Sequence, residues 1–212
     1  MAWFEFENTN TYELIDYNIQ INKNKITLGE IDCLLLENKT LIHLEISYKF
    51  YIVDFNVGTN EIDFCIGPNK RDCLKDKINK ILIQQFPIIE SDETKKYIKN
   101  LGIQFNEIVQ KVLFKAQLFL PFTNQNYEFK FLNNNCIAGF YINKNELYNL
   151  EDCKFYIPFK KDWLLDPFLN VNWISFTDFL KLVENFYKQK NAPLIWIKQT
   201  NGNLQKAFLV WW

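Results

Sequence analysis

Residues 25–53 read KITLGEIDCLLLENKTLIHLEISYKFYIV, and this stretch decides the fold. It contains two runs rich in Ile, Leu, Tyr and Phe, residues 25–36 and 41–53, and this composition is typical of β-strands. The polar residues 37–40 between the runs are typical of a tight hairpin connection. The sequence therefore predicts an antiparallel β-hairpin.

The hairpin sets two acidic side chains against each other. If the connection is a two- or four-residue loop, Leu36 pairs with Leu41, and counting back along both strands places Asp32 opposite Glu45. Directly opposed residues of an antiparallel pair point to the same face, with Cβ atoms about 5 Å apart. Two carboxylates at this separation repel each other, and a divalent cation between them offsets the cost. The pair is therefore a candidate metal site.

The second strand adds a lysine to the same face. Because side chains alternate along a strand, Glu45, Ser47 and Lys49 share one side of it. Two carboxylates can hold Mg²⁺ or Mn²⁺, which polarises a phosphoryl oxygen and activates water, and a nearby lysine stabilises the developing charge. We expect Asp32 and Glu45 to be metal ligands and Lys49 to complete a catalytic site for phosphodiester hydrolysis.

The same residues resemble a nuclease core. Residues 29–32 (GEID) and 45–51 (EISYKFY) are similar to the core strands of the restriction-endonuclease-like, PD-(D/E)xK, superfamily. More closely, residues 28–86 resemble the bacterial domain-of-unknown-function family 1853, which is placed in that superfamily. The residues that carry this closer resemblance, besides the two strands, are Gly67-Pro68-Asn69, Arg71-Asp72, Lys77 and Gln85.

The resemblance implies a site with two departures from the usual pattern. The superfamily's lysine lies two residues after the second acid, where this chain has Ser47, so Lys49 would be a version displaced by one pleat. The superfamily also tends to supply a third acid from a helix before the first strand. Glu13, in a helix expected over residues 8–16, is the candidate for this further metal ligand.

The resemblance also implies the architecture and the substrate. We expect an α/β (α+β) fold with a restriction-endonuclease-like mixed sheet, in which an antiparallel meander is flanked by helices. A single domain would cover residues 1–212, with an aromatic-rich C-terminal extension from about residue 121. The expected substrate is DNA, with RNA as an alternative, and the sequence does not determine the oligomeric state.

The remaining elements follow from composition and periodicity. Pro87 is expected to end the helix that starts at residue 71. The expected elements are strands 17–21, 62–66 and 112–120, helices 71–86, 91–101 and 175–188, and a hairpin of strands 194–198 and 207–212 turning at Asn201-Gly202.

A cationic cluster opens the helix expected over residues 71–86. Asn69, Lys70, Arg71 and Lys77 are candidate nucleic-acid contacts, because free N–H groups and an arginine at a helix N-terminus can receive a phosphate. A solvated helix face is the alternative interpretation. His43, the only histidine, is assigned a surface or structural role rather than a catalytic one.

Bulk properties narrow the class of protein. A formal net charge of -1 and a pI near 5.9 exclude a dedicated basic nucleic-acid-binding protein, so any contact needs a local patch. The five cysteines include no CxxC pair, which favours reduced packing residues and a cytoplasmic location. The chain starts without a signal-like segment and has no apolar run of about 20 residues, so neither secretion nor membrane insertion is expected.

Two other functions stay open. The displaced lysine and the acidic pI favour a catalytically inactive, nuclease-like module that binds nucleic acid or protein. The aromatic-rich C-terminal third, if much of it is exposed, favours a purely structural partner subunit.

Overall fold

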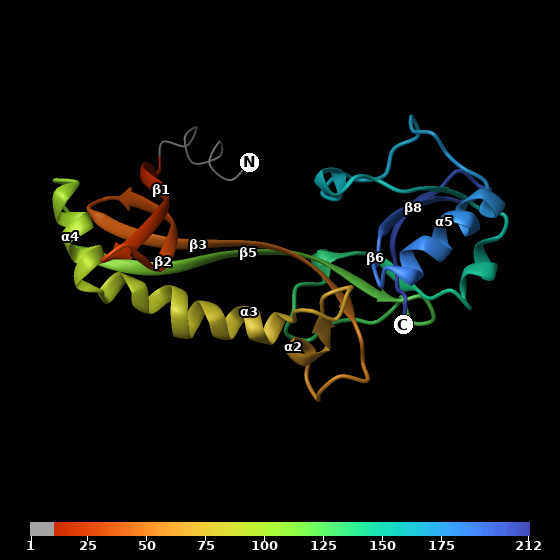
Figure 1. Cartoon of the computed structure of the whole chain (residues 1–212), viewed down its shortest axis with the longest axis horizontal. Coiled ribbons are helices and arrows are strands. Elements are labelled where there is room, and N and C mark those ends of the chain that lie inside the picture. The colour runs from red at the N-terminus through yellow and green to blue at the C-terminus, as the bar shows by residue number, and fades with distance from the viewer. Residues whose placement is uncertain (1–10) are drawn as a thin grey trace. The chain divides into compact units, whose positions relative to one another are not determined.

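The computed structural model describes residues 11–212, which form two compact units (Figure 1). The first unit contains the described part of Met1–Tyr48 together with Asp76–Lys115, and the second contains Lys49–Lys75 and Ala116–Trp212. Strands β3 (Thr40–Val53) and β5 (Glu107–Pro121) contribute residues to both units. The single domain with a C-terminal extension stays a prediction.

The strands are hydrogen-bonded in the order β1-β2-β3-β5-β6-β9-β8-β7, and β4 pairs with β3. The sheet is mixed, because β6 (Ile137–Ile142) runs parallel to both β5 and β9 (Leu204–Leu209) while the hairpins are antiparallel. The described residues thus form a mixed α/β fold with a nine-stranded sheet and four α-helices, which confirms the expected class in its general form.

The first unit is built on the predicted hairpin. Strand β2 (Ile26–Glu37) is followed by a two-residue turn, Asn38 and Lys39, whose φ angles are 47° and 65°. Positive φ at both central residues is the type I′ geometry, which matches the twist of the flanking strands. Glu37 consequently pairs with Thr40, and the even-numbered loop is confirmed.

Strand β1 (Glu13–Lys23) replaces the helix expected over residues 8–16, and that prediction is wrong in its described part. Residues 8–10 lie outside the described residues. Leu14 pairs with Leu35 of β2 and packs on an apolar cluster of β2 and β3. A nine-residue helix is marginal in water, so the hydrogen bonds and apolar contacts along β2 outweigh a weak helical preference.

The helical segment of the first unit changes type along its length. Helix α3 (Leu74–Lys80), whose first residues belong to the second unit, continues as a π-helical turn, η1 (Ile81–Gln85), and then as a 3₁₀ turn, η2 (Phe86–Glu90). The expected end at Pro87 is wrong, because Pro87 stands in the first turn of η2, where its missing N–H costs nothing. Helix α4 (Asp92–Asn100), which confirms the helix expected over residues 91–101, follows and is capped by Ser91. The core of the unit joins strand and helix residues Ile19, Ile21, Ile31, Leu34, Leu41, Ile88, Ile89 and Ile98.

A short helix stands where an extended segment was expected over residues 62–66. Asn60 accepts hydrogen bonds from the backbone N–H groups of Ile62 and Asp63 and so begins α2 (Glu61–Phe64). Only β4 (Cys65–Ile66) is extended. The capping asparagine outweighs the apolar character of the segment.

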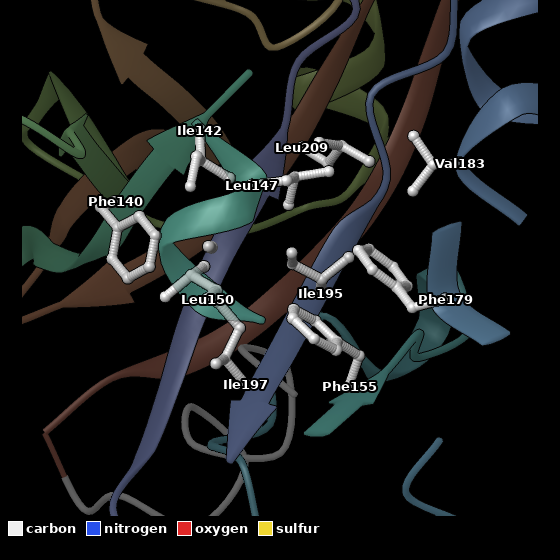
Figure 2. Close-up of a cluster of buried hydrophobic side chains, with 11 residues drawn as sticks. Phe140, Ile142, Leu147, Leu150, Phe155, Phe179, Val183, Ile195, Ile197 and Leu209 are labelled. Atoms are coloured by element: carbon white, nitrogen blue, oxygen red, sulfur yellow. The ribbon is translucent and has the colours of Figure 1, made fainter. Parts of the chain in front are cut away.

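The second unit has its own core, in which Phe155 and Phe179 stack with ring centroids 4.3 Å apart (Figure 2). The predicted C-terminal hairpin is confirmed in β8 and β9, and the predicted helix in α5, which Ser175 caps. Strand β6 was not expected from the sequence. The remaining elements of this unit are η3 (Asn134–Cys136), η4 (Leu147–Leu150), β7 (Lys154–Tyr156), η5 (Lys160–Asp162), α5 (Phe176–Lys188) and β8 (Leu194–Lys198).

All five cysteines, which lie within the described residues, are free thiols. Burial raises the pKa of Cys33 and of Cys65 to about 12, so neither is a thiolate near neutral pH. Across residues 11–212 no helix is both long and apolar enough to cross a membrane.

Candidate functional site

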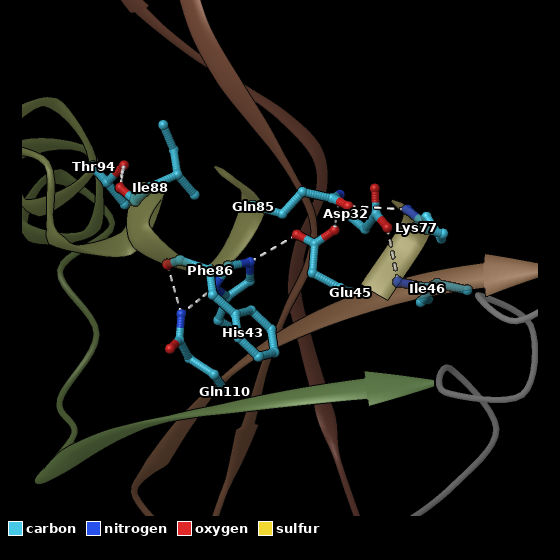
Figure 3. Close-up of polar contacts among 10 residues, drawn as sticks. All are labelled: Asp32, His43, Glu45, Ile46, Lys77, Gln85, Phe86, Ile88, Thr94 and Gln110. Carbon is cyan, nitrogen blue, oxygen red and sulfur yellow. Dashed lines mark hydrogen bonds and ion pairs between the residues drawn. The ribbon is translucent and has the colours of Figure 1, made fainter. Parts of the chain in front are cut away.

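The hairpin register brings Asp32 and Glu45 together. The paired residues run from Glu37 and Thr40 to Cys33 and Leu44, and Asp32 and Glu45 are the next residues on their strands. The carboxyl groups of these two residues are close enough to share a hydrogen bond. Oδ2 of Asp32 accepts the backbone N–H of Ile46 at 2.8 Å (Figure 3). The prediction that the two acids come together is confirmed, whereas their roles as ligands stay predictions.

The environment of Asp32 disfavours its charged form. Burial is the largest cause of its raised pKa, and the charge of Glu45 and a hydrogen bond between the two carboxyl groups raise the pKa further. The N–H of Ile46 and the charge of Lys77 act in the opposite direction without reversing the shift. A cation added beside both carboxylates would lower the pKa of Asp32.

Glu45 is held on both sides. Its side chain is 1% exposed, Oε1 lies 2.8 Å from Nε2 of His43, and Oε2 accepts a hydrogen bond from Nε2 of Gln85. Two partners from different elements, β3 and η1, therefore leave the carboxylate little rotational freedom. His43 is fully buried, so it is not a surface residue, and its structural role stays a prediction.

The partners of His43 determine which of its ring nitrogens carries the proton. Gln110 Nε2 donates to the carbonyl of Phe86 at 2.7 Å and lies 3.2 Å from Nδ1 of His43. An amide nitrogen can only donate, so Nδ1 is the acceptor and Nε2 carries the hydrogen that faces Glu45. A neutral imidazole thus satisfies both contacts and positions Glu45.

Lys77 joins the site through Gln85. Its Nζ donates to Oε1 of Gln85 at 2.9 Å, and its charge acts on Asp32. In a regular α-helix, residues eight positions apart are rotated by about 80° from each other, too far for this contact to be expected. The wider π-helical turn of η1 reduces that rotation.

Lys49, the lysine expected in the site, has a different partner. Its Nζ lies 2.8 Å from Oδ2 of Asp72, and both residues belong to the second unit. Ser47, at the superfamily's usual lysine position, is buried. Lys77, which was expected to contact nucleic acid, is the lysine whose charge acts on Asp32. Regular helical spacing did not predict the contact of Lys77 with Gln85, because it depends on the π-helical turn η1.

Glu13 does not join the two acids. It pairs with Leu36, four positions along β2 from Asp32, which corresponds to about 13 Å at the rise of a strand. Among residues 11–212, no group of three His, Cys, Asp or Glu side chains is arranged to hold a metal ion.

A cavity of about 330 Å³ opens beside Asp32. A Cβ on Gly29 would lie 3.1 Å from Cδ1 of Ile88, so glycine permits the close approach of η2 to β2 at its wall. The polar side chains that line it are Glu30, Asp32, Lys80, Gln84 and Gln85. Asp32 is thus accessible to a small ligand from a polar cavity.

The four predicted nucleic-acid contacts are divided between the two units, and their role stays a prediction. Asn69 Oδ1 accepts the backbone N–H of Ala192 at 2.8 Å, which is a structural contact. Nζ of Lys70 lies 3.5 Å from the ring centroid of Trp212, and Arg71 is exposed. These residues belong to the second unit, whereas Lys77 belongs to the first.

No curated protein and no solved structure matches the chain. A family model described as Domain of unknown function (DUF1853) matches residues 1–210 of the 212. Because this match covers nearly the whole sequence, the chain belongs to the Domain of unknown function (DUF1853) family.

Proposed function

We propose that this protein is a Mg²⁺- or Mn²⁺-dependent nuclease with a restriction-endonuclease-like core that hydrolyses phosphodiester bonds in DNA. The observation that carries the proposal is that the carboxyl groups of Asp32 and Glu45 lie together and that Asp32 lines a polar cavity. Like charges held together on neighbouring strands lower stability, and binding a cation is the function that offsets this cost.

The donor set fits such a metal. Mg²⁺ and Mn²⁺ prefer oxygen ligands, and Mg²⁺ is commonly held by one or two carboxylates while it keeps several waters. Asp32 lines the cavity, and its pKa is raised by burial and by Glu45. A cation bound nearby would therefore stabilise the charged form of Asp32. A bound metal would supply Lewis acidity and an activated water.

The neighbouring side chains have supporting roles. His43 and Gln85 hold the carboxylate of Glu45 in one orientation, and the N–H of Ile46 holds that of Asp32. Lys77, fixed by Gln85, provides positive charge where a phosphate oxygen would gain negative charge. We therefore propose Lys77, in place of Lys49, as the charge-stabilising lysine.

A second function is favoured by one observation. Glu45 is 1% exposed and both of its oxygens already have protein partners. Such a carboxylate can be a structural part of a catalytically inactive core. The protein would then bind nucleic acid or another protein without cleaving it.

Cleavage assays with matched variants test the proposal. Wild type is incubated with plasmid DNA, single-stranded DNA or RNA in Mg²⁺, Mn²⁺ or EDTA, beside Asp32→Asn and the exposed control Asp152→Asn. We expect metal-dependent cleavage of DNA that falls at least about 100-fold in Asp32→Asn and is unchanged in Asp152→Asn. Nucleic-acid binding without cleavage by the wild type would support the inactive module instead. Equal cleavage by Asp32→Asn would refute this site.

A further inference from the structure

The second unit contains a cavity of about 450 Å³ that is separate from the residues of the proposed nuclease site. Two acidic side chains, Asp54 and Glu146, line it together with aromatic rings. None of its described lining residues is a lysine, arginine or histidine. The aromatic lining residues are Phe55, Phe122, Tyr141 and Trp212.

Asp54 is a buried carboxylate with an unused oxygen. The residue is 6% exposed, and its Oδ1 accepts both the backbone N–H and the side-chain amide of Asn56, each at 3.0 Å. Within residues 11–212, no hydrogen bond or ion pair reaches Oδ2. The side chain lines the cavity, so this oxygen is available to a ligand there.

The local turn does not explain the charge of Asp54. The turn at Asn56 needs one acceptor oxygen, and an asparagine at position 54 would supply it without a charge. Burying a carboxylate without a positive partner is unfavourable. A ligand that brings positive charge into the cavity would remove this cost.

Glu146 adds a second negative charge to the same place. Its Oε2 accepts the backbone N–H of Asn143 at 3.0 Å. Burial raises the pKa of Tyr141 to about 12, and the charges of Asp54 and Glu146 contribute to the shift. Both carboxylates therefore act on the hydroxyl of Tyr141, which stays protonated, and the cavity combines negative potential with aromatic surface.

We propose that this cavity binds an organic cation, an ammonium or a guanidinium group, between the carboxylates of Asp54 and Glu146 and the surrounding aromatic rings. Carboxylates pair with such cations, and aromatic faces attract them. Lys70 already contacts the ring of Trp212 in this way, with its Nζ 3.5 Å from the centroid.

Titration calorimetry with simple probes tests this site on the full chain. Cadaverine and agmatine represent free organic cations, Nα-acetyl-lysine methylamide represents the side chain of a protein partner, and 1,5-pentanediol is the neutral counterpart of cadaverine. We expect the cations to bind and the diol not to bind. Tighter binding of the lysine derivative than of the free amines would identify a protein side chain as the source, and the reverse order would identify a small molecule.

Matched variants locate the binding. Asp54→Asn keeps the acceptor for Asn56 and removes the charge, so we expect its affinity for the cations to fall at least tenfold. Glu146→Gln should also weaken binding of the cations. This variant tests the cavity if Asp54→Asn does not fold. Glu151→Gln, an exposed control outside the cavity, and Asp32→Asn should bind as the wild type does. Three results would overturn the proposal. They are unchanged affinity in both cavity variants, binding of the diol as tight as that of the cations, and binding of Ca²⁺ but of none of the organic cations.

Discussion

The carboxyl group of Asp32 on β2 lies beside that of Glu45 on β3, and the charge of Glu45 adds to the burial that raises the pKa of Asp32. Because the folded pKa exceeds the ordinary value of 3.8, the folded state binds more protons than the unfolded state just above that pH. The free energy of unfolding contributed by Asp32 therefore falls as the pH rises from 3.8 through the raised pKa.

Asp32→Asn should stabilise the protein at neutral pH. The amide oxygen can still accept the N–H of Ile46, and the repulsion with Glu45 is lost, so we expect a gain of about 1 kcal/mol in the free energy of unfolding. The gain should disappear below pH 3.8, where Asp32 is protonated in both states. Urea unfolding between pH 3 and 8 measures the difference in free energy of unfolding from wild type. Asp32→Ala, which loses the hydrogen-bond acceptor, is the comparison and should be less stable than Asp32→Asn. A variant that is destabilised equally at every pH would contradict the repulsion.

The two lysines should differ in their effect on catalysis. Lys77→Met removes the charge that acts on Asp32 and should lower kcat about 100-fold, the usual scale for losing one electrostatic contact to a transition state. Lys49→Met breaks a half-exposed ion pair with Asp72, so the free energy of unfolding should change by less than about 1 kcal/mol and cleavage should hardly change. Steady-state cleavage and chemical unfolding of both variants make the comparison. The opposite ranking would return the catalytic role to Lys49.

His43 should carry its proton on Nε2. As it is the only histidine, long-range ¹H–¹⁵N correlation spectra will contain signals from a single imidazole. At neutral pH we expect Nε2 to be protonated and Nδ1 to be unprotonated, because Gln110 donates to Nδ1. Gln110→Leu removes this donor and should broaden or shift the Nδ1 signal. A protonated Nδ1 in the wild type would show that the contact with Gln110 is arranged differently.

Glu61 should stabilise the second unit in a pH-dependent way. Its buried carboxylate accepts the backbone N–H groups of Lys130 at 2.6 Å, Phe131 at 2.8 Å and Leu132 at 3.0 Å. Burial alone would raise the pKa of Glu61, but these three contacts prevail and lower it. The stabilisation is therefore present above the ordinary pKa of 4.5 and is lost as the pH falls through the folded pKa.

Glu61→Gln should lower the free energy of unfolding by about 2 kcal/mol at pH 7, because an amide has one acceptor oxygen and no charge for three donors. The difference from wild type should shrink as the pH falls below 4.5. Thermal melts across this range measure it, with the exposed Glu128→Gln as the control. A loss that does not depend on pH would mean that shape rather than charge matters at this position.

The hairpin was predictable because its determinants are local. Asn38 and Lys39 tolerate positive φ, the flanking runs have the composition of strands, and the two-residue turn then sets the register that opposes Asp32 and Glu45. The caps of α4 and α5 were predictable for the same reason, since Ser91 and Ser175 bond to N–H groups three residues later.

Two of the misjudged features arose where distant contacts decide the structure, whereas the error over residues 62–66 came from overlooking the local cap Asn60. Glu13 and Leu14 lie in a strand because β2 offers hydrogen bonds and apolar surface, which no local pattern reveals. The π-helical turn that brings Lys77 to Gln85 also depends on packing.

The sequence by itself determined that this chain would set two acids against each other across a hairpin, because turn chemistry and side-chain alternation are properties of neighbouring residues. Only the tertiary structure decided which groups surround those acids. Gln85 reaches Glu45 from 40 positions away, and Lys49 turns to Asp72 instead, because such contacts depend on how helices pack on a sheet rather than on spacing along one strand.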